Sequence, residues 1–390
     1  MSNSKNFFEK DKINVPFFRP QITKEDRDNI QKSLSSHVLT NGPIIENFEK
    51  KFSKFTQSKY AIGVSSATAA LHLSLISLGI TKGDEVIVPN ITFPATANVV
   101  LMTGATPILV DVDYDDVNIL PDSIEESITE KTKAIIPVHF AGKSCKIKKI
   151  VSIAKKSKLK IVEDCAHAIG TKIQNRHVGN FGDAGCFSFY PTKNITSLEG
   201  GMVVTNNKRI LEQIRILRNH GINRTLKERY SSSHPWDYDI QILGYNYRLD
   251  EIRSTLGLSQ LKRIDKINAG RQEAFSYYYQ KLKNVNGVVL PTLDDLKNNS
   301  CHLFCIKIEP KKFGKNRDFV FKKLLEFGIS TSIHYKPLNL FSIYKKSAKS
   351  FSCLKNSSII YKQILSLPLY SGITNDEQDR VVNALKLIKN

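Results

Sequence analysis

The sequence predicts an α/β fold, with a large and mostly parallel sheet domain followed by a smaller C-terminal α/β domain. From residue 60 onward, short runs of β-branched residues alternate with segments of helical periodicity, which is the pattern of strand–helix crossovers in a parallel sheet. The length of 390 residues allows two or three domains at roughly 100–200 residues each. A hydrophobic content of 41% is ordinary for a packed globular chain.

The first domain, which we place at residues 1–250, opens with two helices. Thr23 and Asp26 form a capping pair at the start of the first, and Gly42-Pro43 begins the second at Ile44. Leucines at helical spacing after Ala67 predict a helix between the first two strands. The expected strands are Tyr60–Val64, Glu85–Val88, Thr106–Val110, Ala134–Val138, Lys160–Val162, Asp183–Phe189 and Gly201–Thr205.

The second domain, at residues 251–390, is joined to the first by a helix. Apolar positions recur at helical spacing and predict one long helix over residues 250–283. Beyond it we expect a strand at Cys301–Ile308, a helix at Asp318–Phe327 and a strand at Ile329–His334.

The charge balance of 57 basic and 37 acidic residues gives a net charge of +20, which suits anionic partners such as nucleic acid or phosphorylated small molecules. The lysines are scattered over helix faces, and the sequence has no zinc-finger spacing, basic heptad segment or ribonucleoprotein-type aromatic motif. We therefore expect a lysine-rich solvated surface and no nucleic-acid partner, with nucleic-acid binding kept as the alternative that the charge alone suggests.

Neither membrane insertion nor a metal site is expected. The best apolar stretch, Val99–Val110, is interrupted by Gly104 and Pro107 and is shorter than the roughly 20 residues of a membrane span. The first twelve residues are polar and hold no apolar signal core. The six cysteines form no CxxC pair and no zinc-ligand spacing. These features predict a cytoplasmic, reduced protein.

Three segments follow predicted strands, at the sheet edge where open parallel sheets bind ligands. Ser65 to Ala69 places small residues at the start of a helix, where backbone N–H groups and the helix dipole hold a phosphate, and Thr68 adds a hydroxyl. An ordinary helix cap explains this segment equally well. The run Ile161–His167 ends an apolar strand in Glu163 and Asp164, which suits either capping or the binding of a cationic ring nitrogen.

The third segment delivers Ser188 at the end of the strand Phe187–Phe189, turns at Pro191 and presents Lys193 before the pair Gly200-Gly201. A lysine among many is usually solvated, but one that directly follows a buried strand suits Schiff-base chemistry. A phosphate cradle, a carboxylate for a pyridinium nitrogen and an imine-forming lysine, in this order, meet the needs of pyridoxal phosphate.

With these motifs the chain resembles the DegT/DnrJ/EryC1/StrS family of sugar aminotransferases from about Pro16 to Leu385. The resemblance implies the fold-type I architecture of aspartate aminotransferase, pyridoxal 5'-phosphate as cofactor and Lys193 as the lysine that carries it. Asp164 is then the partner of the pyridine nitrogen, and both residues are the catalytic pair. The other cofactor-binding residues that the resemblance implies are Ala67, Thr68 and Ser188 at the phosphate, Phe93 on the pyridine ring, and His167 beside the cofactor.

The segment Gly244–Arg248 matches the family stretch in which an asparagine, here Asn246, reaches the phosphate bound by the other subunit. This implies a homodimer with shared active sites, although local structure alone also explains such a turn. Tyr190 stands where the family often has histidine. The candidates for substrate contacts, with the two arginines assigned to the diphosphate, are Tyr190, His220, Arg224, Arg229, His334 and Tyr335.

The reaction implied is amino transfer, from glutamate by family analogy, to a nucleotide-diphosphate 4-keto-6-deoxy sugar for cell-surface polysaccharide or glycan biosynthesis. Two alternatives lie within the same family. A sugar 3-dehydratase carries histidine in place of the lysine, which Lys193 argues against. A non-catalytic regulatory member usually has a broken cofactor site, and the matched positions here are intact.

Overall fold

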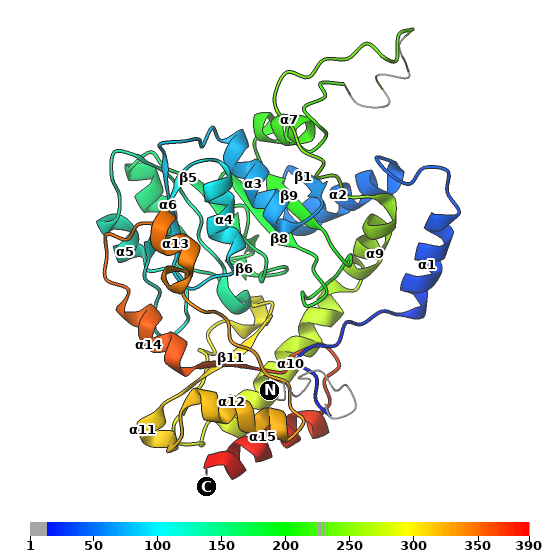
Figure 1. The fold of residues 1–390 in the computed structure, drawn as a ribbon. Helices are drawn as coiled ribbons and strands as arrows, with labels where there is room; N and C mark the ends of the chain where they lie inside the picture. Colours follow the sequence, from blue (N-terminus) through cyan, green and yellow to red (C-terminus); the bar gives the residue numbers. More distant parts are fainter. Residues whose placement is uncertain (1–13, 225–227, 229–230, 232, 390) are drawn as a thin grey trace, which may run out of the picture.

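A seven-stranded sheet forms the centre of the computed structural model, which describes residues 14–389 apart from 225–227, 229, 230 and 232 (Figure 1). Its strand order is β1-β9-β8-β5-β4-β2-β3, and β9 alone runs antiparallel to its neighbours. This confirms the predicted large, mostly parallel sheet. The strands are β1 (Tyr60–Val64), β2 (Glu85–Pro89), β3 (Thr106–Val110), β4 (Thr132–Ile135), β5 (Lys160–Asp164), β8 (Ala184–Ser188) and β9 (Gly201–Thr205).

Helices cover both faces of this sheet, which is why its strands are apolar on both sides. On one face α3 (Ala67–Ser77), α4 (Ala95–Met102) and α7 (Lys208–Leu217) pack on side chains such as Val162 and Cys186. Neighbouring residues of the same strands, Ile161 and Phe187, point to the opposite face. That face is covered by α2 (Pro43–Thr56), α5 (Pro121–Glu126), α6 (Ile147–Lys156) and α9 (Glu251–Leu261).

The predicted single helix over residues 250–283 is wrong, because the chain forms two helices. Asp250 caps α9 by accepting a hydrogen bond from the Arg253 backbone N–H, and α10 (Ile264–Leu282) begins after a break at Arg263. The Arg263 guanidinium donates to the Asp26 carboxylate of α1 (Lys24–Leu34) at 2.6 Å. The side chain at the break thus ties α10 to α1, the helix that the predicted Thr23 and Asp26 capping box begins.

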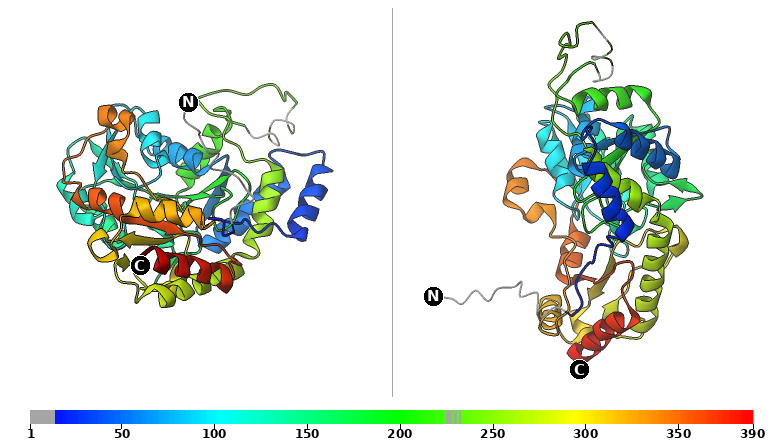
Figure 2. Two further views of the ribbon diagram at one scale, coloured as in Figure 1. Left: turned by 60° about the horizontal axis from the view of Figure 1, so that its bottom comes forward. Right: turned by 90° about the vertical axis from the view of Figure 1, so that its right-hand side faces the viewer.

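A three-stranded antiparallel sheet forms the small unit together with α10, α12 (Arg317–Glu326) and α15 (Asn375–Lys389). At the end of the molecule that bears the C-terminus, α15 packs against both α10 and α12 (Figure 2). Its strands are β10 (Val288–Val289), β11 (Phe304–Ile308) and β12 (Ile364–Leu367). The division of the chain at residue 250 stays a prediction.

The expected strand at Ile329–His334 is wrong. This segment makes only isolated bridges, Val15 with Ile329 and Ser332 with Ser366, so no continuous ladder forms. The strand expected from Cys301 begins instead at Phe304, because Cys301 has a φ of 47° that a strand does not accept.

An N-terminal strap, residues 14–22, runs from the small unit to α1. Val15 lies in the core of the small unit, and the backbone N–H groups of Asn14 and Val15 donate to the Gly328 carbonyl at 2.9 and 3.1 Å. Further along, the Gln21 side chain donates to the Ser371 carbonyl at 2.6 Å. The strap is therefore attached to the small unit before it enters α1.

The remaining elements are short. They are the hairpin β6 (Lys172–Ile173) and β7 (Arg176–His177), the helices α11 (Pro310–Phe313), α13 (Ser342–Ser347) and α14 (Lys355–Gln363), and the 3-10 turns at Phe140–Gly142, Leu296–Asn298 and Leu338–Leu340. Among the helices in the described part of the chain, none has the length and apolar content needed to cross a membrane.

Candidate functional site

Asp164 is the last residue of β5 and presents a buried carboxylate at the carboxyl edge of the sheet. Its oxygens accept hydrogen bonds from the Thr96 hydroxyl at 3.0 Å and from the Ala166 backbone N–H at 3.1 Å. Burial raises the pKa of Asp164, while these two hydrogen bonds and the charge of Lys193 act in the opposite direction. Because burial disfavours its charge, a cationic ligand would stabilise this carboxylate.

Glu163, the other carboxylate of this strand end, points to the opposite face of the sheet and has a structural role. Its oxygens accept hydrogen bonds from His139 Nε2 at 3.0 Å and from the backbone N–H groups of Gly179, Phe181 and Gly182 at 2.8, 2.6 and 2.7 Å. Burial would raise the pKa of Glu163, but these bonds outweigh it and hold the pKa below its usual value.

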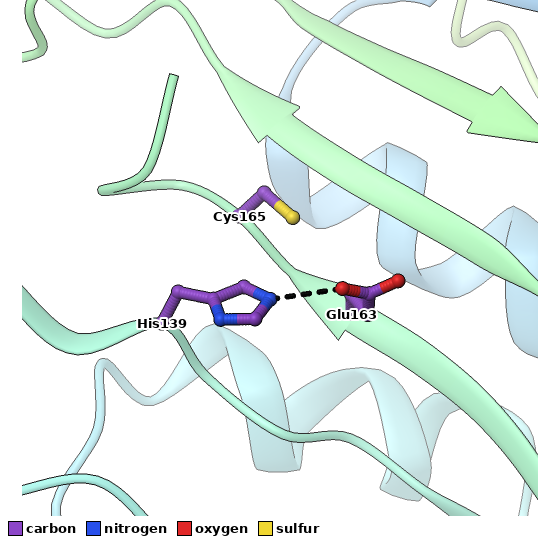
Figure 3. Close-up of side chains that lie close together, drawn as sticks. All are labelled: His139, Glu163 and Cys165. Atoms are coloured by element: carbon purple, nitrogen blue, oxygen red, sulfur yellow. Dashed lines mark hydrogen bonds and ion pairs between the residues drawn. The ribbon is translucent and has the colours of Figure 1, made fainter. Parts of the chain in front are cut away.

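His139, Glu163 and Cys165 lie close enough together to resemble a set of metal ligands (Figure 3). The ring nitrogens of His139 and the carboxylate oxygens of Glu163 already make hydrogen bonds within the protein. His139 Nδ1 accepts from the Cys145 backbone N–H at 3.3 Å, so its Nε2 carries the proton donated to Glu163. Burial raises the pKa of the Cys165 thiol well above its usual value, which keeps it protonated. The cluster is accounted for as a hydrogen-bonded anchor of β5.

Lys193 lies in the turn that follows β8, and its backbone N–H donates to the Tyr190 carbonyl at 2.9 Å. The side chain is half-buried and lines two small cavities. The strap and α10 also line the first cavity, and His302, His334 and Tyr335 also line the second. Burial lowers the pKa of Lys193 to about 8, with the charge of Arg271 acting in the same direction and that of Asp164 opposing it. The amine is thus easily deprotonated and nucleophilic.

The residues predicted to bind the phosphate lie around the start of α3. The Ser66 hydroxyl caps the helix by accepting from the Ala69 backbone N–H at 3.1 Å, which leaves the first turn, with Ala67 and Thr68, at the site. Ser188 pairs with Gly201 in the sheet, and a Cβ on Gly201 would lie 2.4 Å from the Ser66 carbonyl group. Glycine at 201 lets the helix start lie directly against β9, next to Ser188 at the end of β8.

An aromatic wall surrounds the space next to Lys193. The Ala141 backbone N–H donates to His167 Nδ1 at 3.4 Å, so His167 Nε2 carries the proton and donates to the Tyr335 hydroxyl at 3.1 Å. Phe93, with 58% of its surface exposed, lies edge-on to Tyr335 with ring centroids 6.1 Å apart. Burial lowers the pKa of His167 well below its usual value, so this histidine is neutral.

His334 completes this wall on the side of the small unit. Its ring stacks on Phe17 of the strap, and its Nδ1 is 2.8 Å from the Ser366 hydroxyl. Burial lowers the pKa of His334 to about 3. The predicted residues His167, Lys193, His334 and Tyr335 are therefore brought together.

Sequence reasoning missed four residues of this region: Thr96, Asn194, Arg271 and His302. Arg271 is buried, and its guanidinium donates to the carbonyls of His302 and Leu369, both at 3.1 Å. Asn194 and His302 are hydrogen-bonded to each other at 3.1 Å although they are 108 residues apart. Only Asn194, adjacent to the lysine, carried a local signal that could have identified it.

Other predicted residues lie apart from this cluster within the single chain. Asn246 and His220 are exposed, and Tyr190 is 47% exposed in the turn before Lys193. Arg224 is exposed and donates to the Asp237 carbonyl at 2.9 Å. Arg229 lies outside the described residues. Three of these candidates, His220, Arg224 and Asn246, lie on described residues between α7 and α9, and part of this segment projects from the body of the molecule (Figures 1 and 2).

The clustered residues fit pyridoxal phosphate. The charge of the buried Asp164 would be stabilised by a cationic ring nitrogen, the start of α3 offers backbone N–H groups beside Ser188, and Lys193 has an amine with a lowered pKa. The donor set matches the ring nitrogen, the phosphate and the aldehyde of this cofactor in turn.

Comparisons with known proteins agree with this geometry. The profile of the DegT/DnrJ/EryC1/StrS aminotransferase family matches residues 20–386. The spore coat polysaccharide biosynthesis protein SpsC of Bacillus subtilis is 37% identical over 95% of this chain and 96% of its own. The putative sugar aminotransferase Spr1654 of Streptococcus pneumoniae in its PMP-form superposes with a TM-score of 0.90 at 29% identity, covering 96% of this chain and 99% of that one.

A structure of Spr1654 in its PLP-form superposes with a TM-score of 0.88. The aminotransferase PseC of Helicobacter pylori, involved in the biosynthesis of pseudoaminic acid, gives a TM-score of 0.88 at 32% identity, over 96% of this chain and 98% of that one. The sheet order, the lysine turn and these matches lead to one assignment. The chain belongs to the DegT/DnrJ/EryC1/StrS aminotransferase family, with its fold-type I architecture and its pyridoxal phosphate cofactor.

Proposed function

We propose that this enzyme transfers an amino group, from glutamate, to the 4-keto group of a nucleotide-linked 6-deoxy sugar used in cell-surface polysaccharide or glycan biosynthesis. The observation that carries the proposal is the amine of Lys193, with its lowered pKa, placed among Asp164, His167 and Tyr335. The names of two relatives support the sugar substrate, because SpsC acts in spore coat polysaccharide biosynthesis and PseC in that of pseudoaminic acid.

In this proposal Lys193 Nζ would hold the cofactor covalently, and the same amine, when free, would move a proton to and from the substrate carbon. The bound cofactor supplies a cationic ring that stabilises negative charge developing at that carbon. Asp164 keeps the ring nitrogen protonated through a charge-assisted hydrogen bond. Ala67, Thr68 and Ser188 hold the phosphate at the start of α3, and Phe93 and His167 enclose the ring.

The substrate residues are assigned by the same proposal. His334 and Tyr335 line the cavity next to Lys193, where they contact the sugar ring with Tyr190. Arg224 and Arg229 contact the nucleotide diphosphate, and His220 is a further substrate contact. The net charge of +20 favours the encounter with this anionic substrate. The free cysteines fit a reducing compartment, and we place the enzyme in the cytoplasm.

A homodimer is part of the proposal. The segment between α7 and α9 exposes large apolar side chains, with Trp236 at 71% and Leu243 at 83% of their surface. A monomer rarely keeps such a group of apolar side chains in water. Asn246, exposed near the end of the same segment, then serves the cofactor phosphate of the other subunit.

Incubation with glutamate and a panel of nucleotide 4-keto sugars, followed by mass spectrometry, tests the reaction. We expect a product in which the ketone has become an amine. A product that has instead lost a hydroxyl group would identify a dehydratase and refute the proposal. Borohydride trapping and peptide mapping should find the cofactor on Lys193, and Lys193→Ala should lose both the label and the activity, whereas Lys172→Ala, a change in the β6–β7 hairpin, should keep them.

A further inference from the structure

Asn194, next to the lysine, is a buried side chain whose hydrogen bonds are all made to segments distant in sequence. Its Nδ2 donates to Asn268 Oδ1 of α10 at 2.8 Å and to the Ser300 carbonyl at 2.6 Å. Its Oδ1 lies 3.1 Å from His302 Nδ1. An amide oxygen only accepts, so His302 Nδ1 carries a proton and donates it here. The two oxygens around Nδ2 and the one donor at Oδ1 fix the orientation of the amide.

The same network reaches the segment that follows Asp164. Asn268 Nδ2 donates to the Ile169 carbonyl at 3.0 Å, and the Ser300 hydroxyl donates to the His167 carbonyl at 2.8 Å. Asn268 also lies against Gly170, where an added Cβ would be 2.3 Å from its amide nitrogen. The turn that carries Lys193 and the turn that carries His167 are thus attached to one buried polar cluster.

His302 also contacts the ring of His167. Its ring lies on that of His167, with centroids 4.4 Å apart and a tilt of 36°. Burial lowers the pKa of His302 well below its usual value, so the ring is neutral and has one N–H, which is the one on Asn194. This N–H therefore sets the tautomer and orientation of the ring that supports His167.

We propose that Asn194 and His302 are positioning residues, whose mutual hydrogen bond fixes the turn presenting Lys193 and thereby the position from which its amine would bind the cofactor and move a proton. The proposal rests on the proposed function in that Lys193 is taken to carry the cofactor. Buried polar groups without partners are costly, so the network of four buried polar side chains beside the lysine, Asn194, Asn268, Ser300 and His302, points to a role in orientation. A reacting group displaced by about 1 Å can lose on the order of 100-fold in rate.

Two substitutions separate the hydrogen bond from the ring. His302→Phe keeps an aromatic ring against His167 but removes the N–H. His302→Asn places an amide N–H near the position of Nδ1 but removes the ring. His37→Phe, at an exposed histidine, is the matched control. Two rates are measured: the attachment of pyridoxal phosphate to the apoprotein, followed by visible absorbance, and the single-turnover reaction of the loaded enzyme with saturating glutamate.

We expect His302→Phe to slow both rates by about 10- to 100-fold, while the KM for glutamate stays within about threefold of that of the unaltered enzyme. His302→Asn should restore both rates to within about threefold of the unaltered enzyme. Unaltered rates in His302→Phe, or an equal loss in His302→Asn, would overturn the proposal. If His302→Phe does not fold, Asn194→Ala takes its place, and its double variant with His302→Asn should then be no slower than Asn194→Ala alone.

The failure of the proposed function has a different outcome. If borohydride trapping leaves Lys193 unlabelled in the unaltered enzyme, Lys193 does not carry the cofactor and the proposed function fails. If Lys193 is labelled in every variant and the two rates do not change, only the positioning role of Asn194 and His302 is refuted.

Discussion

In the proposed function Lys193 is the residue on which the chemistry depends, and its surroundings favour attack on a carbonyl. Burial and the nearby Arg271 guanidinium disfavour the ammonium form, which brings the pKa to about 8. About a tenth of the amine is then neutral at pH 7, compared with far less than a hundredth at an ordinary lysine pKa. What distinguishes Lys193 among the 57 basic residues is its surroundings and not its residue type.

The attachment of pyridoxal phosphate to the apoprotein should therefore depend on pH in a particular way. The neutral amine reacts, so the attachment rate should rise about tenfold per pH unit below pH 8 and level off above about 8, because the pKa is lowered to that value. Absorbance measured over a pH series gives the rate. A rate that continues to rise up to pH 10 would contradict the lowered pKa.

Asp164→Asn should retain the cofactor and lose most of the rate. The amide has no charge with which to hold a protonated ring nitrogen, and we expect a loss of about 100-fold or more in kcat, or ~3 kcal/mol. Steady-state kinetics and a cofactor absorbance assay give the two quantities. Asp183→Asn, at a carboxylate that bonds the Ile161 backbone on the opposite edge of the sheet, is the control and should leave kcat unchanged.

At this scale, the sequence predicts the residues that lie in one short segment each. Asp164 and Lys193 follow predicted strands directly, and Ser188 and Gly201 flank the lysine turn. Asn194 and His302 could not be paired in advance, because 108 residues separate them and only the packing of the small unit joins them. Glu163 and Asp164 are both carboxylates at the end of the same apolar strand. Because side chains alternate along a strand, Glu163 points to the other face of the sheet.

At the scale of elements, the contact between α3 and β9 shapes the phosphate cradle. Strand β9 carries glycine at its first position, and the beginning of α3 lies directly over it. The strands and the start of α3 are predictable from local sequence. The break between α9 and α10 is not, because the apolar spacing continues across it and the ion pair of Arg263 with Asp26 spans 237 residues.

Gly201→Ala should weaken cofactor binding. Its Cβ would lie 2.4 Å from the Ser66 carbonyl and 2.7 Å from the Ala67 nitrogen, so the first turn of α3 must shift. Overpacking of about 1–3 kcal/mol corresponds to a loss of roughly 5- to 150-fold in affinity for pyridoxal phosphate. Gly270→Ala is the matched control, since it meets only the Ser371 hydroxyl at 3.0 Å, and its affinity for the cofactor should be unchanged.

Glu163→Gln should destabilise β5. The neutral amide offers one acceptor oxygen to three backbone N–H groups and to His139, so we expect a loss of about 3–5 kcal/mol in the free energy of unfolding. Because the pKa of Glu163 is lowered in the folded state, its stabilisation is present at neutral pH and is lost as the pH falls through the folded pKa. Denaturant unfolding of this variant, with the exposed Glu130→Gln as control, measures the difference.

At the scale of the whole molecule, the projecting segment between α7 and α9 is the feature that a single chain leaves unexplained. It exposes apolar side chains, and it carries Asn246, which the resemblance places at the cofactor phosphate. Both observations find a common reason if two subunits contribute to each site.

Mixing two inactive variants tests this arrangement. In a dimer of one Lys193→Ala and one Asn246→Ala subunit, one of the two sites keeps both residues if Asn246 serves the other subunit. Dissociated and reassembled mixtures should recover about a quarter of the original activity, since about half of the dimers are mixed. Recovery close to zero, with mixed dimers present by mass spectrometry, would show that Asn246 serves its own subunit.

The N-terminal strap has a consequence for how substrates enter. It is held to the small unit at Val15 and to α1 through Thr23, and Phe18 and Arg19 between these points form a wall of the cavity at Lys193. Any separation of the small unit from the central sheet has to bend this stretch and take the wall with it. Opening of the molecule and widening of the route to the lysine are therefore one and the same movement.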